Sequence, residues 1–90
     1  MAAEGQFLKG EVLYDQDNYQ EAAIQYLRVK YLFGEYPFWV LRSVYSAGLC
    51  YEHLDNKVEA IKLFQSIQQS FPDSKFADLA KQHINQITGR

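Results

Sequence analysis

The sequence contains little cysteine and little proline, and it lacks any dense run of one charge. Its 90 residues include one cysteine and two prolines, with nine basic and eleven acidic side chains. A single thiol cannot form an internal disulfide or a multi-cysteine metal site. Because no Lys/Arg-rich run is present, no surface is expected to follow the phosphates of a nucleic acid. These shortages argue against disulfide-framed, metal-clustered and nucleic-acid-binding proteins.

Long apolar runs are missing as well. No stretch approaches the roughly 18 uninterrupted apolar residues of a membrane span, and Met1 to Gln6 has neither a basic flank nor a hydrophobic signal core. We therefore expect a soluble chain without membrane insertion. What the sequence does contain is 48% apolar residues, with seven tyrosines, six phenylalanines and one tryptophan. That composition is typical of one globular domain in which many rings are buried at one end and hydrogen-bonded at the other.

An internal repeat appears when the sequence is shifted by about 38 residues. The shift aligns Gly10 with Gly48, Asn18 with Asn56, Glu21 with Glu59, Ala22 with Ala60, Tyr26 with Phe64 and Val29 with Ile67. Apolar residues recur at steps of three and four, which indicates helices, and strand alternation is absent. Five helices are predicted near Glu4–Gln16, Asn18–Phe33, Phe38–Leu54, Lys57–Ser70 and Ser74–Ile87.

The breaks between these helices carry capping and turn residues. Asp15 to Asn18 and Asp55 to Lys57 offer Asp/Asn caps, while Gly34 with Pro37 and Pro72 to Ser74 close the two units. Gly10 and Gly48 lie within helices, where glycine costs about 0.5 to 1 kcal/mol relative to alanine. We expect a close helix approach at both, with Ala22 and Ala60 as small counterparts and the surrounding space filled by Tyr19, Tyr26 and Phe64.

The repeat resembles the tetratricopeptide repeat, a helix-turn-helix family. The likeness rests on Gly48, Tyr51, Ala60, Phe64 and Pro72 in the second unit, and more loosely on Gly10, Leu13, Tyr19, Ala22 and Tyr26 in the first. The first unit departs from the pattern by about one extra turn, Tyr31 to Glu35. The resemblance implies an all-α fold and a single domain over 1–90: units at about 4–36 and 38–72, a capping helix at about 74–87, and a right-handed α-solenoid fragment.

A narrower likeness concerns Gly48 to Leu54 and the tail from Phe71 onward. These segments are similar to tetratricopeptide modules of the bacterial cell envelope, such as the C-terminal domain of the Tol-Pal coordinator protein. This likeness would imply a periplasmic or envelope-associated location.

Catalytic motifs are absent from the sequence. His53 and His83 lie 30 residues apart outside any ligand motif, and Cys50 precedes Tyr51 within a predicted helix, as a buried filler would. We therefore predict no enzyme activity, no cofactor and no metal.

The candidate site is implied by the resemblance, in which the first helix of each unit lines a concave groove. Carried over, the groove residues are Phe7, Glu11, Tyr14, Arg42, Tyr45, Leu49, Glu52 and His53, extended on the cap by Phe76, Leu79 and His83. Phe7, Leu49 and Leu79 could instead be core. Tyr14, Arg42 and Tyr45 are the stronger candidates, because Tyr and Arg are enriched at binding hot spots.

The partner is expected to be a protein or peptide. The positions that hold a cationic clamp in the chaperone-binding branch of the family are here Phe7, Glu11, Tyr45 and Leu49, which argues against acidic chaperone tails. An apolar or partly basic helix or extended peptide fits better. Two alternatives remain open: a partner-binding scaffold, excised from a larger protein, or a self-assembling unit whose repeat faces stack between copies. The aromatic corner of Phe33, Tyr36, Phe38 and Trp39 could be a junction core or an exposed contact patch.

Overall fold

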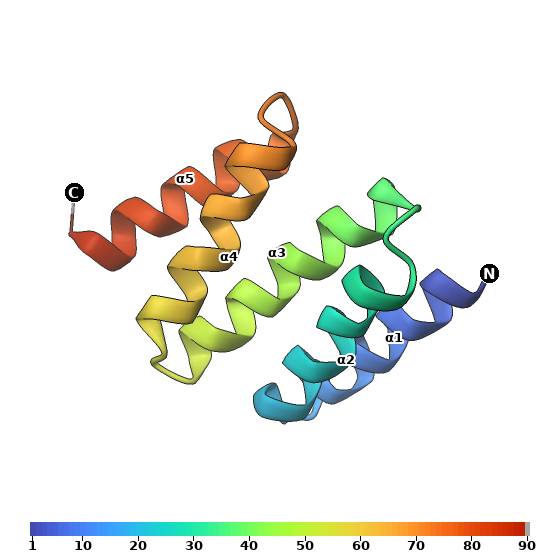
Figure 1. Ribbon diagram of the computed structural model, residues 1–90. Coiled ribbons are helices and arrows are strands. Elements are labelled where there is room, and N and C mark those ends of the chain that lie inside the picture. The colour runs from blue at the N-terminus through green and yellow to red at the C-terminus, as the bar shows by residue number, and fades with distance from the viewer. Residues whose placement is uncertain (90) are drawn as a thin grey trace.

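The computed structural model describes residues 1–89, which form five α-helices and contain no strand (Figure 1). They are α1 (Ala2–Asp15), α2 (Tyr19–Leu32), α3 (Pro37–His53), α4 (Lys57–Ser70) and α5 (Lys75–Thr88). Every predicted helix is present, and each predicted boundary lies within two residues of the observed one. The all-α prediction is therefore confirmed.

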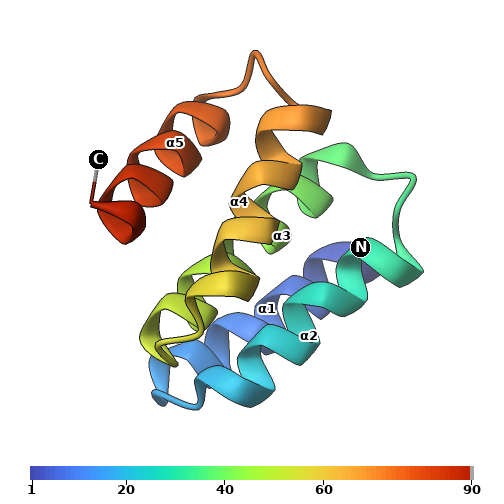
Figure 2. The ribbon, with the colours of Figure 1, turned by 60° about the vertical axis from the view of Figure 1, so that its left-hand side comes forward.

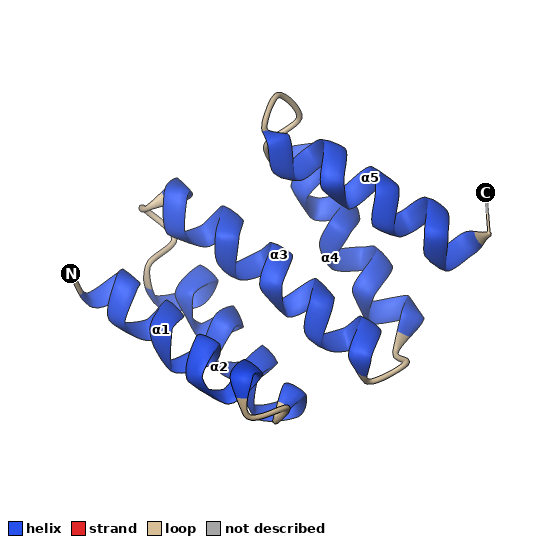
Figure 3. Ribbon diagram, turned by 180° about the vertical axis from the view of Figure 1, so that it is seen from behind, coloured by secondary structure: helices blue, strands red, loops and turns tan. Residues whose placement is uncertain are grey.

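The helices form two layers, and α3 is the middle helix of one of them. Helix α1 contacts α3, and α3 contacts α5, so these three helices lie side by side (Figure 3). Helices α2 and α4 form the other layer, each packed against α3 and against its neighbours in the chain, and no Cα atom of α2 lies within 8 Å of a Cα atom of α4. Figure 2 shows the α1–α2 and α3–α4 hairpins stacked, with α5 packed on α4 at the far end. Helix α3 is thus shared by both halves of the molecule.

The turns inside the two hairpins have the same backbone geometry. Asp17 and Asp55, 38 residues apart, are the described non-glycine residues with positive φ, at 60° and 56°. The next residues donate their backbone N–H groups five positions back, from Asn18 to Leu13 O and from Asn56 to Tyr51 O, both at 2.9 Å. This is the hydrogen bond of a Schellman motif, with aspartate at the left-handed position that glycine usually occupies.

The predicted side-chain caps are present at only some helix starts. Asn56 Oδ1 accepts from the Glu59 amide at 3.4 Å, and Ser74 Oγ accepts from the Ala77 amide at 3.1 Å. Asn18 makes no such bond, so the cap predicted there is wrong. The start of α2 is held instead by the backbone bond from Ala22 N–H to Asn18 O, at 2.9 Å.

Each hairpin is closed by an aromatic ring that lies against a glycine. A Cβ placed on Gly10 would come within 2.5 Å of Tyr26 Cδ1, and one on Gly48 within 2.7 Å of Phe64 Cε1. Both rings are fully buried. A close approach is therefore present at both glycines, but the predicted counterparts Ala22 and Ala60 are wrong, because the group nearest to each glycine is the ring of the following helix.

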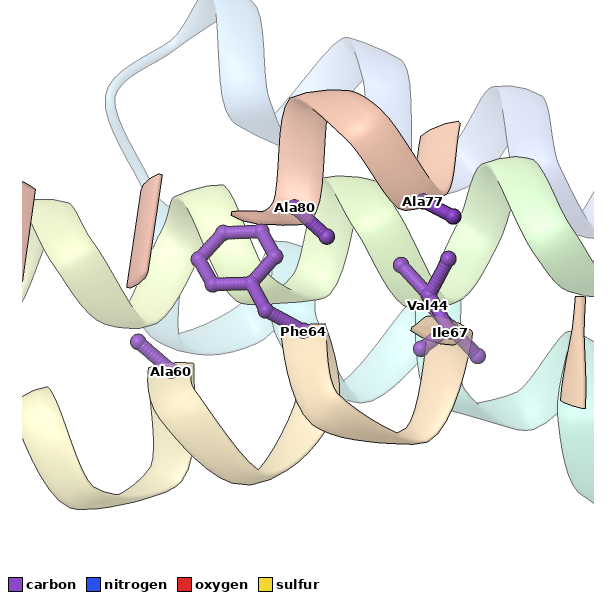
Figure 4. Close-up of a cluster of buried hydrophobic side chains, with 6 residues drawn as sticks. All are labelled: Val44, Ala60, Phe64, Ile67, Ala77 and Ala80. Carbon is purple, nitrogen blue, oxygen red and sulfur yellow. The ribbon is translucent and has the colours of Figure 1, made fainter. Parts of the chain in front are cut away.

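Two hydrophobic clusters surround these rings, and α3 contributes to both. The first holds Ala22, Ala23 and Tyr26 of α2 with Ala47 and Cys50 of α3. The second, drawn in Figure 4, consists of Val44, Ala60, Phe64, Ile67, Ala77 and Ala80. In that view the Phe64 ring points from α4 toward Ala80 of α5. The core is therefore continuous along the stack of helices.

The aromatic corner is divided between core and surface. Phe33 and Trp39 are half-buried, and the Trp39 ring centroid lies 5.6 Å from that of Phe7. Tyr36 and Phe38 are 40% and 55% exposed, so the junction-core interpretation is wrong for these two residues. The reason is geometric, because consecutive helical residues point about 100° apart and Phe38 cannot share the direction of Trp39.

Gly48→Ala should lower the free energy of unfolding by about 1 to 2 kcal/mol. The added methyl group forces the Phe64 ring to shift, which costs more than the gain in helix propensity. Gly5→Ala is the matched control, because beyond its chain neighbours and the local backbone of α1 no atom lies within 4 Å of a Cβ at Gly5. It should stabilise the chain by up to about 1 kcal/mol. Urea denaturation measures both, and equal effects would contradict the packing of Phe64 against Gly48.

The thiol of Cys50 should be protected in the folded chain. Its side chain is completely buried, and this burial raises the pKa of the thiol to about 12. Disulfide reagents at pH 8 should therefore label Cys50 at least about a hundredfold more slowly in buffer than in urea. Because the unfolded chain loses the thiol proton first, the free energy of unfolding should also fall as the pH rises above about 9. Rapid labelling of the native chain would show that Cys50 is accessible.

Candidate functional site

The residues of the predicted groove all lie on the layer formed by α1, α3 and α5 (Figure 3). We call this surface the α1–α3–α5 face. Its members are Phe7, Glu11 and Tyr14 on α1, Arg42, Tyr45, Leu49, Glu52 and His53 on α3, and Phe76, Leu79 and His83 on α5. None of these side chains is fully buried, and His53 is exposed. All of them are thus at least partly open to solvent in the described chain.

One interhelical link on this face is built by Tyr14, Tyr19 and His53. The hydroxyl of Tyr14 lies 3.0 Å from His53 Nε2. The His53 ring stacks on Tyr19, the first residue of α2, with centroids 4.1 Å apart and planes within 1°. Burial raises the pKa of Tyr14, so its hydroxyl remains protonated at neutral pH and can donate to the imidazole. This link joins the C-terminal ends of α1 and α3 to the start of α2.

A second link of the same kind joins α3 to α5. The Tyr45 hydroxyl lies 2.9 Å from His83 Nε2, and the other ring nitrogen, Nδ1, lies 2.8 Å from Glu52 Oε1. The contact between Nδ1 and Glu52 Oε1 does not have hydrogen-bond geometry, so it is a close approach of the carboxylate to the imidazole ring. Burial, followed by the charge of Glu52, raises the pKa of Tyr45. His83 also stacks on Phe64, at 5.0 Å, which connects this link to the core.

Positive charge collects where α3 and α5 begin. The Arg42 guanidinium lies 3.5 Å from the centroid of the Phe38 ring and 5.5 Å from that of Phe76, and Lys75 Nζ is also 5.5 Å from Phe76. Arg42 Nη1 donates to Phe38 O at 3.3 Å. Arg42 forms no ion pair with a carboxylate of residues 1–89. The helix dipoles add to this charge, because the N-termini of α3 and α5 lie at the same end.

Acidic side chains of the α1–α3–α5 face lie farther along α1 and α3. Glu52 is close to the C-terminus of α3, and Glu11 on α1 accepts a hydrogen bond from the hydroxyl of Tyr26. Burial and this bond raise the pKa of Tyr26, which keeps the phenol neutral. The α1–α3–α5 face therefore changes from cationic at the start of α3 to mildly acidic toward its end.

The three residues that could have been core, Phe7, Leu49 and Leu79, are neither fully buried nor fully exposed. Phe7 is half-buried, with its ring centroid 5.5 Å from that of Tyr26. Leu49 is half-buried and packs against the cluster around Phe64, and Leu79 is half-buried on α5. Phe7 and Leu49 thus pack against the core clusters with one part of their surface and leave another part open to solvent.

Two residues that contact the α1–α3–α5 face, Phe38 of α3 and Tyr19 of α2, were not among the predicted site residues. Phe38 lies four residues before Arg42, and this spacing on a helix could have indicated their stacking. Tyr19 was expected to fill space near the glycine contacts, yet it stacks on His53, 34 residues away. No local pattern predicts that contact, because it depends on how α2 begins beside the end of α3.

The described chain holds no group of three or more His, Cys, Asp or Glu side chains that could bind a metal ion. None of its helices is both long and apolar enough to cross a membrane.

Comparison with known proteins places one of the two hairpins in a family. Residues 42–74 match the family described as tetratricopeptide repeat, and they span most of α3, all of α4 and the turn that follows. Searches of curated proteins and of solved structures gave no significant match. The chain is therefore an all-α helical repeat protein whose residues 42–74 match the tetratricopeptide repeat, a unit that generally mediates contacts between proteins.

Proposed function

We propose that this chain is a non-catalytic interaction module that binds a helix or an extended segment of a partner protein on its α1–α3–α5 face. The observation that carries the proposal is the pair of tyrosine–histidine contacts, Tyr14 with His53 and Tyr45 with His83, which tie three helices together. Rings held in place before binding lose little conformational freedom when a partner arrives. A prearranged aromatic surface is therefore well suited to recognition.

The charge distribution supports a partner with two different ends. Arg42 and Lys75 favour a carboxylate where α3 and α5 begin, and Glu11 and Glu52 favour a basic or neutral residue farther along. The aromatic side chains between them favour apolar contacts. We infer an apolar, partly basic segment that binds in one direction. The acidic tails of chaperones fit less well, because Glu11 would face them.

Self-association is the second candidate function, and the exposed apolar corner favours it. Tyr31 and Leu32 are 75% and 61% exposed, and Tyr36 and Phe38 follow in the same stretch of chain. Large exposed apolar side chains that gather in one region are typical of contact surfaces. In this alternative, copies of the chain would meet at this corner, and the α1–α3–α5 face would be a by-product of the repeat.

Two further features belong to the same proposal. We propose that the chain forms a single domain, with units at about 4–36 and 38–72 and a capping helix at about 74–87. A location in the bacterial cell envelope stays a prediction that rests on the likeness of Gly48 to Leu54 and of the tail.

Peptide selection should identify binders whose affinity depends on Arg42. We expect peptides selected from a phage-displayed library on the purified chain to bind Arg42→Glu at least about tenfold more weakly, which corresponds to 1.4 kcal/mol. Lys62→Glu on α4 is the matched control, since it makes the same charge change in the other helix layer. Titration by fluorescence anisotropy measures both. If the peptides bound Arg42→Glu as tightly as the unchanged protein and bound Lys62→Glu more weakly, the binding surface would lie on the other helix layer.

Light scattering over a dilution series tests self-association. The scaffold function predicts a monomer from micromolar to millimolar concentration. The alternative predicts a mass that rises with concentration and returns to that of the monomer in Phe38→Ser, because Phe38 is 55% exposed. A strict monomer at all concentrations would contradict self-assembly.

A further inference from the structure

A shallow groove of about 450 Å³ runs along α1 and α2 at the end of the helix stack away from α5. It is lined by Lys9, Val12, Leu13, Gln25 and Arg28, and we call it the α1–α2 groove. Val12 is 56% exposed, and Leu8, also on α1, is 51% exposed. The α1–α2 groove is separate from the contacts that form the α1–α3–α5 face.

The internal repeat shows how the same surface is used in the second unit. A shift of 38 residues places Gly5, Lys9 and Val12 on Ser43, Ala47 and Cys50. These three residues of α3 are fully buried, and Ala47 and Cys50 belong to the cluster with Ala22, Ala23 and Tyr26 of α2. The equivalent surface of α3 is thus covered by the helix α2. The α1–α2 groove has the position that such a helix would occupy on the first unit.

Gly5 provides a second, independent observation. It lies within α1, where glycine costs about 0.5 to 1 kcal/mol relative to alanine, and beyond its chain neighbours and the local backbone of α1 no atom of the described chain is within 4 Å of a Cβ at this position. Gly10 and Gly48 each accept a ring, whereas no contact inside the chain accounts for Gly5. A second helix that approaches α1 closely would account for it.

The charges of the groove indicate the chemistry of the helix that it accepts. Lys9 and Arg28 form no ion pair with a carboxylate of residues 1–89. The repeat equivalent of Arg28 is Ser66, which lines a small cavity together with Lys30 of α2. A helix that covered the groove as α2 covers α3 would therefore bring its counterpart of Lys30 toward Arg28. An acidic residue at that position would form an ion pair.

We propose that the α1–α2 groove binds an amphipathic helix of a partner protein, in the orientation that α2 has on α3. This helix carries small apolar residues where α2 has Ala22 and Ala23, and a carboxylate where α2 has Lys30. A second copy of the chain fits poorly in either arrangement. Two grooves face to face would bring Lys9 and Arg28 of both copies together, and the exposed surface of α5 is polar, with Asp78, Lys81, Gln82, Asn85 and Gln86.

The probe is a synthetic peptide with the sequence of residues 19–32 and the substitution Lys30→Glu. A staple between positions 20 and 24, which are exposed in α2, keeps it helical. By fluorescence anisotropy, the purified chain should bind this peptide roughly three- to tenfold more tightly than the peptide that retains Lys30. With Arg28→Glu in the protein, this preference should reverse, since the charge opposite position 30 is then negative.

Variants of the groove locate the binding. Val12→Asp should weaken binding of the peptide at least about tenfold, whereas Val58→Asp, the same change at an exposed valine of α4, should leave it unchanged. Gly5→Leu should also block binding without lowering the melting temperature, because the space around Gly5 is open in the free chain. Circular dichroism checks that each variant is folded.

Three results would overturn the proposal. One is that neither peptide binds up to millimolar concentration. Another is that the peptide binds the Val12→Asp variant as tightly as the unchanged protein. The third is a concentration-dependent dimer, seen by light scattering, that Val12→Asp abolishes, because a second copy would then be the occupant. The peptide selection on Arg42 tests a different surface, so either proposal can fail without the other.

Discussion

The insertion of an aromatic ring against a glycine is the contact on which the rest of the structure depends. Tyr26 lies on Gly10, and Phe64 lies on Gly48, so that in both hairpins a large side chain occupies the space that a Cβ would need. This contact sets how close the two helices of a hairpin lie. Because it occurs twice with the same spacing, the two hairpins have similar shapes and can stack on the shared helix α3.

The arrangement of the α1–α3–α5 face follows from this stacking. When α1, α3 and α5 lie side by side, their facing side chains meet in pairs, and two of these pairs join a tyrosine hydroxyl to an imidazole nitrogen. The Phe64 ring that fills the space at Gly48 also stacks on the His83 ring. Core packing and the arrangement of the α1–α3–α5 face are therefore coupled, and a change at Phe64 would disturb both.

The two ends of the stack differ in chemistry although the fold repeats. At one end, α5 buries Ala77 and Ala80 and presents a polar outer surface. At the other end, α1 exposes Leu8 and Val12 and contains Gly5, for which no contact within the chain provides a reason. This difference between equivalent surfaces supports a partner helix at the α1–α2 groove.

The sequence by itself determined the helices, their turns and the glycine contacts, because these follow from local spacing and from small residues that repeat every 38 positions. For the α1–α3–α5 face, the sequence predicted which residues of the three helices belong to it, but not the contacts between their side chains. Tertiary structure decided that Tyr19 stacks on His53, that Arg42 lies between Phe38 and Phe76, and that Phe38 is exposed while Trp39 is half-buried. Most of these contacts join side chains 34 or more residues apart, and their geometry depends on the angles at which whole helices pack, which local periodicity does not encode.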